Sequence, residues 1–317
     1  MDIQLRALSS ISVLLILILG VWFFKHIGLL KEEHGPVCAT LVTKVTLPAL
    51  IFLSLIHADL KWGHGMMVIL LMGVSIVCLG LGRLIAWAFR LHGPAVAPVI
   101  LTTGFSSSSV LGVALISELF PGNKQAVVDT VVISGLGMAP LVFTLGTMIA
   151  QYYGETASTP QERRKAALDY FRSPIFCALV AGFALANVTN HDNSIIHSIL
   201  DGLRVVSAGN TLLVLLSVGL LLQLHNFKGI IALAACVAFV NLIVMPMLIL
   251  LPAHSMDLAH WEIEVLILEG AMPAIMVPVV LCEAYGADGR LAAKLVLSTL
   301  AVSIFTIPAI FLLRGLL

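Results

Sequence analysis

Apolar segments follow one another along almost the whole chain, each close to the roughly 20 residues that a helix needs to cross a bilayer. Short polar connections separate them, and a longer polar stretch covers residues 154–172. Hydrophobic residues make up 60% of the chain and charged residues 11%, whereas ordinary soluble domains are about 25% charged. The sequence therefore predicts an all-α polytopic membrane protein.

The hydropathy of the sequence predicts ten transmembrane helices, five in each half of the chain. They are expected at residues 7–24, 35–56, 66–89, 95–120, 126–152, 174–188, 205–224, 229–252, 263–285 and 291–313. Lys and Arg gather in the loops on one side, including 154–172, and the positive-inside rule assigns that side to the cytoplasm. We therefore expect a cell inner (plasma) membrane protein with both termini outside the cytoplasm.

The two halves of the chain share weak similarities that occur in the same order. The clearest one aligns Thr102–Gly122, in the fourth predicted helix, with Leu268–Gly286 in the ninth. An odd number of helices per half places the halves in opposite orientations, as in the inverted repeats of secondary transporters. Residues 1–153 and 173–317 are therefore expected to form two inverted five-helix repeats, joined by a cytoplasmic loop at 154–172.

Two prolines interrupt the ninth predicted helix. Pro273 and Pro278 each remove a backbone donor, and the residues before them, Met272 and Val277, are biased away from helical conformation. Broken helices occur in membranes only where protein or a water-filled cavity satisfies the backbone, and transporters use them as binding sites. Glu269, just before the break, is either a residue that couples transport to Na⁺ or H⁺ or a structural carboxylate near the membrane boundary.

The fourth predicted helix carries four consecutive serines, followed by Gly112. Serine hydroxyls bind nearby backbone and compete with regular helix, so a second break is expected around Ser106, Ser107, Ser108 and Ser109. The alternative is that these small residues only permit close helix packing. Asn210, in the seventh predicted helix, either faces a substrate or makes an interhelical hydrogen bond.

Several function classes find no support in the sequence. The formal net charge is +0, so the chain lacks the excess of positive charge that is typical of nucleic-acid-binding proteins. The cysteines form no C-x-x-C motif, and neither they nor the histidines show the spacing of a metal site. G-x-S-x-G and G-x-x-x-x-G-K-[ST] are absent, so neither a serine hydrolase nor an ATP-coupled protein is indicated, and no cofactor is implied. A channel or a ligand-sensing membrane protein stays open as an alternative to a carrier.

The chain resembles the auxin efflux carrier family, whose bacterial members include malonate and malate carriers. The resemblance covers nearly the whole chain and rests on VTLPALIFLSL at Val45–Leu55, SVGLLLQ at Ser217–Gln223 and EGAMPAIMVPVVLCEAYGAD at Glu269–Asp288. Aligned on Gly112, the chain has Ser107 where the family commonly has Asn, and Ala114 where it commonly has Pro.

The resemblance implies a scaffold of helices 1, 2, 6 and 7 and a moving transport domain of helices 3–5 and 8–10. In this arrangement the broken helices 4 and 9 cross and bind a small organic anion such as malonate, malate or an auxin-like acid. The transport domain then carries the anion across the membrane by elevator-type alternating access. Homodimers through the scaffold are also implied, and bile-acid sodium symporters are more distantly similar. The substrate-binding residues expected on this basis are Ser106, Ser107, Ser108, Ser109, Gly112, Met272, Pro273, Ala274, Pro278 and Asn210.

Overall fold

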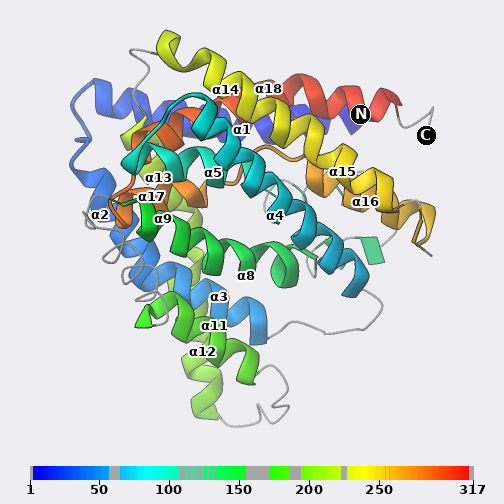
Figure 1. Cartoon of the computed structure of the whole chain (residues 1–317). Coiled ribbons are helices and arrows are strands. Elements are labelled where there is room, and N and C mark those ends of the chain that lie inside the picture. Colours follow the sequence, from blue (N-terminus) through cyan, green and yellow to red (C-terminus); the bar gives the residue numbers. More distant parts are fainter. Residues whose placement is uncertain are drawn as a thin grey trace.

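The computed structural model describes most of the chain as helix (Figure 1). The described residues are 3–56, 65–107, 112, 116, 120, 125–126, 129–130, 133–154, 172–185, 194–222, 227–253, 255–256 and 258–313. Within these ranges the only β pairing is one isolated antiparallel bridge. The predicted all-α class is confirmed.

The helices of the first half begin with α1, and several of them contain a π-helical turn. Their bounds are α1 (Ile3–His26), α2 (His34–Leu41), η1 (Val42–Thr46), α3 (Leu47–Ile56), α4 (Gly65–Ala88), η3 (Gly93–Ala95), α5 (Val96–Gly104), η5 (Ile133–Met138), α8 (Ala139–Leu141), η6 (Val142–Gly146) and α9 (Thr147–Tyr153).

The helices of the second half include the stretch with the two prolines, which is divided between α16 and α17. Their bounds are α11 (Pro174–Leu185), α12 (Ser194–Ala208), α13 (Asn210–Leu221), η8 (Phe227–Ile230), α14 (Ile231–Phe239), η9 (Val240–Val244), α15 (Met245–Ala253), α16 (His260–Ala271), α17 (Val277–Ala284) and α18 (Gly289–Leu313).

Six helical stretches among the described residues are long and apolar enough to cross a membrane. They are His34–Leu53, Gly65–Ala88, Ile133–Tyr153, Ser198–Leu221, Ile231–Ala253 and Gly289–Ile310. Two apolar helices, Ile16–His26 and Gly93–Gly104, are shorter. The polytopic character predicted from the sequence is thereby confirmed, whereas the division into ten helices and two inverted repeats stays a prediction.

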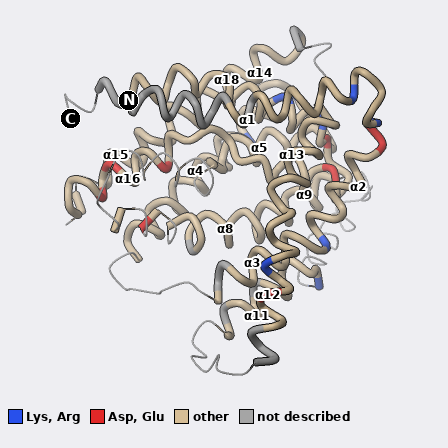
Figure 2. Tube along the Cα trace, turned by 180° about the vertical axis from the view of Figure 1, so that it is seen from behind, with Lys and Arg blue, Asp and Glu red and all other residues tan. Residues whose placement is uncertain are grey.

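The outer surface of the molecule is apolar, as expected for helices that face lipid. Large side chains such as Trp87, Val205 and Phe305 are more than two-thirds exposed, at 71%, 77% and 75%. Charged residues are sparse along the trace (Figure 2). An exposed apolar surface of this extent indicates contact with a partner or a membrane, and the span lengths favour the membrane.

The helices pack into a core that surrounds α5. α4 lies against α5, and α18 contacts α1, α14, α17 and α5. α3 packs against α11 and α12 at one end of the molecule (Figure 1). This arrangement places the short α5 and the α16–α17 junction inside the helix bundle.

The seventh predicted helix begins earlier than expected. The polar stretch before residue 205 is the helix α12, and a spanning stretch runs from Ser198 to Leu221 with an interruption at Gly209. The early start follows from packing, because Leu200 and the neighbouring Leu203 form a small apolar cluster with side chains of α3. A partner helix that contributes Leu53 and Ile56 therefore stabilises a segment that looks polar on its own.

Candidate functional site

The fourth predicted helix does not continue as one helix from residue 95 to 120. α5 ends at Gly104, and Phe105 is extended, with φ −122° and ψ 122°. The hydroxyls of Thr102 and Thr103 donate to the carbonyls of Pro98 and Val99, each at 2.6 Å. Side-chain bonds of this kind loosen the end of a helix. Ser108 and Ser109 lie outside the described residues.

The ninth predicted segment does not form one straight helix either, as its two prolines predicted. α16 ends at Ala271, and Met272 is extended, with φ −66° and ψ 146°, as expected for a residue before proline. Pro273 therefore lies within the break. Pro278 does not, because it stands in the first turn of α17, where a missing N–H removes no helical hydrogen bond. The expectation that both prolines interrupt the helix is thus right for Pro273 and wrong for Pro278.

The two breaks pair with each other. Ser106 and Ala274 form an antiparallel bridge, in which the Ser107 N–H donates to the Pro273 carbonyl at 2.7 Å and the Ile275 N–H donates to the Phe105 carbonyl at 3.1 Å. Backbone groups that leave a helix inside a membrane must find partners within the protein. Here each break supplies partners for the other, over a separation of more than 160 residues in sequence.

Side chains of the two breaks and their neighbours add further bonds. The Ser106 hydroxyl, fully buried, donates to the Glu269 carbonyl at 2.9 Å, in the last turn of α16. The Ala274 N–H donates to the Thr299 hydroxyl of α18 at 3.2 Å. The Asn241 amide nitrogen, in the π turn η9, lies 3.5 Å from the Thr103 carbonyl. Ser106 and Ala274 were expected here from the sequence, whereas Thr299 and Asn241 were not.

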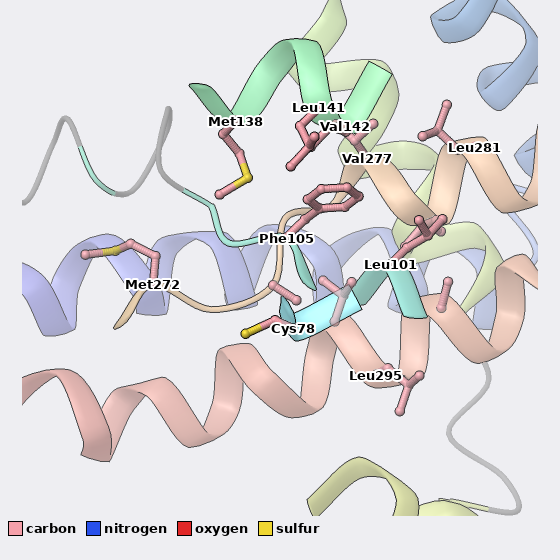
Figure 3. Close-up of a cluster of buried hydrophobic side chains, with 14 of the residues drawn as sticks. Cys78, Leu101, Phe105, Met138, Leu141, Val142, Met272, Val277, Leu281 and Leu295 are labelled. Atoms are coloured by element: carbon pink, nitrogen blue, oxygen red, sulfur yellow. The ribbon is translucent and has the colours of Figure 1, made fainter. Parts of the chain in front are cut away.

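An apolar cluster covers the paired breaks on one side. Phe105 is fully buried, and its ring lies among Leu101, Leu141, Val142 and Val277 (Figure 3). Gly146, on the neighbouring helix, leaves room for this ring, since a Cβ at Gly146 would lie 3.2 Å from Phe105. The cluster keeps the first break in one position.

Glu269 and Gly112, two residues singled out from the sequence, come together. Glu269 has no exposed surface, and its carboxylate lies so close to Gly112 that a Cβ there would overlap Oε1. The nearby Glu262 differs, because it caps the start of α16 by accepting from the Ala259 N–H at 2.7 Å. Glu269 therefore lies inside the protein rather than at its surface.

Asn210 is joined to a different pair of helices. It is the first residue of α13, it is 7% exposed, and its Oδ1 accepts from the Thr46 hydroxyl at 2.9 Å. The interhelical hydrogen bond considered from the sequence is present. No hydrogen bond joins Asn210 to the described residues of the two breaks.

One carbonyl in the last turn of α5 and one in the last turn of α16 accept hydrogen bonds at the breaks, whereas no described group accepts from the first N–H of α17. The Leu101 carbonyl accepts from the Phe105 N–H at 3.2 Å, and Glu269 accepts from Ser106. At the start of any helix the first N–H groups have no acceptor within the helix, which makes this end suited to an anion. In α17 only the N–H of Val277 remains, since Pro278 has no N–H and Val279 donates to the carbonyl of the half-buried Met276 at 3.1 Å.

Apolar spanning helices around a pair of joined helix breaks are typical of one class of protein, the polytopic membrane transporters. A family model described as membrane transport protein matches residues 8–311, and the chain belongs to this family. The match confirms the resemblance to the auxin efflux carriers. The more distant resemblance to bile-acid sodium symporters stays a prediction.

Two similar proteins come from archaea. An uncharacterized transporter of Methanocaldococcus jannaschii is 25% identical over 311 residues, which is 95% of this chain and 96% of the relative. An uncharacterized transporter of Methanothermobacter thermautotrophicus is 24% identical over 312 residues, 95% of each chain. Both resemble this chain over nearly their whole length.

Proposed function

We propose that the protein is a secondary transporter or facilitator of a small organic anion, a carboxylate such as malonate, malate or an auxin-like acid. The observation that carries the proposal is the pairing of the two breaks through Ser106 and Ala274 in a chain of a membrane transport family. Such pairing holds irregular backbone deep in a membrane protein, which is the arrangement that transporters use for substrate sites.

The polarity of the breaks favours an anion over a cation. The Leu101 carbonyl of α5 and the Glu269 carbonyl of α16 accept hydrogen bonds from the protein, so these two are less available to a cation. The amino end of α17 carries about half a positive charge. The N–H of Val277 and the hydroxyl of Ser107 are the described donors to which we assign the carboxylate, with Ser108, Ser109 and Gly112 contributed by the following segment.

The joined breaks support movement as one body. Hydrogen bonds connect α5, the α16–α17 junction and α18, and α4 and α14 also pack against this group. We assign these elements to a transport domain, and α1, α2, α3, α11 and α13 to a scaffold, with elevator-type alternating access. The two inverted repeats at residues 1–153 and 173–317, the cytoplasmic loop 154–172, the outward termini, the inner (plasma) membrane location and a homodimer through the scaffold belong to the same proposal.

Glu269 is the residue we assign to coupling. Its carboxylate is buried beside Gly112, and because an ionisable group inside a membrane protein is costly, its presence there points to a functional role. Either a proton on this carboxylate or a bound Na⁺ would link its charge to the state of the neighbouring break. A Glu269→Gln variant whose uptake keeps the sodium and pH dependence of the wild type would remove the residue from this role.

Uptake into proteoliposomes tests the function. Radiolabelled malonate, malate and indole-3-acetate are offered separately, each with a sodium gradient, a proton gradient or neither. We expect saturable uptake of one acid, with counterflow when the vesicles are preloaded with the same acid. A channel would give flux that does not saturate and no counterflow, and a ligand sensor would bind an acid without moving it.

A further inference from the structure

The fully buried Thr299 on α18 forms a hydrogen bond with the backbone of the second break. Its hydroxyl accepts the Ala274 N–H at 3.2 Å and donates to the Val296 carbonyl of its own helix at 2.9 Å. A threonine hydroxyl has one donor and two acceptor positions. Bonding to Val296 therefore orients the hydroxyl so that a lone pair remains for Ala274.

The Ala274 N–H depends on this hydroxyl. In the bridge between the breaks, the donors are the N–H groups of Ser107 and Ile275. Pro273 has no N–H, and the Ala274 N–H faces away from these two bonds. Ala274 is 3% exposed and Met272 is fully buried, so without Thr299 this N–H would be a buried donor without an acceptor among the described residues.

We propose that Thr299 is a positioning residue for substrate, which fixes the conformation of residues 272–276 and thereby the direction of the Val277 N–H at the start of α17. The proposal rests on the proposed function, since it assigns the substrate carboxylate to that helix start. α18 reaches this point because it runs alongside both α17 and α5. The hydroxyl thus ties the site to a long, continuous helix.

The same helix offers a matched control. Ser303 lies four residues after Thr299, is equally buried, and donates to the Leu300 carbonyl at 2.7 Å, again three residues back. Among the described residues it makes no hydrogen bond to another helix. Ser303→Ala therefore removes a buried hydroxyl with a local bond from α18 but leaves the break untouched.

The test compares Thr299→Val, Thr299→Ser and Ser303→Ala in the purified full chain. Valine keeps the shape of threonine without its hydroxyl, and serine keeps the hydroxyl. Hydrogen–deuterium exchange of a peptide covering residues 272–277 reports on the break without any substrate. We expect faster exchange of this peptide in Thr299→Val alone, because its Ala274 N–H loses the acceptor.

Uptake of radiolabelled malonate by the same variants reports on the site. Thr299→Val should raise KM about tenfold, the usual scale for one buried hydrogen bond, with a smaller change in the maximal rate. Thr299→Ser and Ser303→Ala should stay near the wild-type KM. Malate and indole-3-acetate replace malonate if the wild type prefers either of them.

Two results would overturn the positioning role. One is exchange in Thr299→Val that matches Ser303→Ala, which would mean that the hydroxyl does not hold the break. The other is faster exchange with an unchanged KM, which would make Thr299 a structural residue only. If the wild type takes up none of the three acids, the proposed function fails and the assignment to substrate fails with it, while the exchange data still decide whether Thr299 holds the break.

Discussion

The carboxylate of Glu269 lies directly against the backbone of Gly112, so a larger side chain fits at position 112 only if this buried carboxylate moves. Gly112 belongs to the segment that follows the first break, and Glu269 belongs to the last turn of α16, just before the second. The contact is therefore a further link between the two broken segments, in addition to the bridge between Ser106 and Ala274 and the bond from Ser106 to the Glu269 carbonyl.

Gly112→Ala should weaken both folding and uptake. The added Cβ overlaps Oε1 of Glu269, and overpacking of this kind costs about 1–3 kcal/mol. Glu269→Asp withdraws the carboxylate by one methylene, so the double variant should recover part of the lost thermal stability. Gly80→Ala is the control, because a Cβ at Gly80 on α4 meets nothing within 4 Å. If Gly112→Ala unfolds at the same temperature as Gly80→Ala, the Glu269 carboxylate is not held in place against Gly112.

The adjacent serines of the first break should respond differently to substitution. Ser106→Ala removes the bond to the Glu269 carbonyl and should lower the free energy of unfolding by about 1 kcal/mol.

Ser107→Ala should leave that free energy nearly unchanged and raise KM for the transported acid. Within the described residues the hydroxyl of Ser107 makes no hydrogen bond, and its N–H to Pro273 is kept in alanine. Thermal unfolding and uptake are measured on both variants. Equal loss of stability with unchanged KM would support the view that the serines serve only close packing.

The break at Pro273 could be predicted from sequence because its cause is local. A proline disfavours helical conformation at the preceding residue, and at Met272 this bias acts in the middle of an apolar segment. The same local rule fails for Pro278, since a proline is as acceptable in the first turn of a helix as in a break, and only the position of the new helix start distinguishes the two. The run of serines predicted the first break for a similar local reason.

The side chains of other helices that form hydrogen bonds at the breaks could not be predicted from local sequence rules. Thr299 and Asn241 stand in apolar helices, where a single polar residue is most simply explained by a bond to its own helix. Their partners, Ala274 and Thr103, are distant in sequence, and only the packing of α18 and η9 against the breaks brings them together. A π turn such as η9 often marks a functional position, but it leaves no sequence signal here.

A partly buried ammonium near the end of α13 gives a prediction about stability. Nζ of Lys25 donates to the carbonyls of Leu220 and Leu222, each at 2.7 Å, and lies 3.6 Å from Glu32. Lys25→Met leaves these carbonyls without their donor and should cost about 1–3 kcal/mol in unfolding free energy. Thermal unfolding of the detergent-solubilised protein measures this.

Arg290→Gln provides the contrast. Arg290 is more than half exposed and pairs with the same Glu32 at 2.7 Å. An exposed pair is worth about 0–1 kcal/mol and is weakened by salt, so this variant should approach the wild type at high ionic strength. The Lys25→Met deficit should persist in salt. A deficit that disappears with salt in both variants would argue against the bonds to the helix end.

The two prolines should differ in effect, although they are five residues apart in one motif. Pro273→Ala removes the restriction on Met272 and allows α16 to extend through the break, so uptake should be lost or KM strongly raised. Pro278→Ala should change the free energy of unfolding by about 1 kcal/mol or less, since alanine is also accepted in a first helical turn. Pro308→Ala, inside α18 and away from the breaks, controls for loss of a membrane proline. A well-folded Pro273→Ala/Pro278→Ala double variant with wild-type uptake would contradict the broken-helix site, because a continuous helix could not offer the Val277 N–H assigned to the substrate.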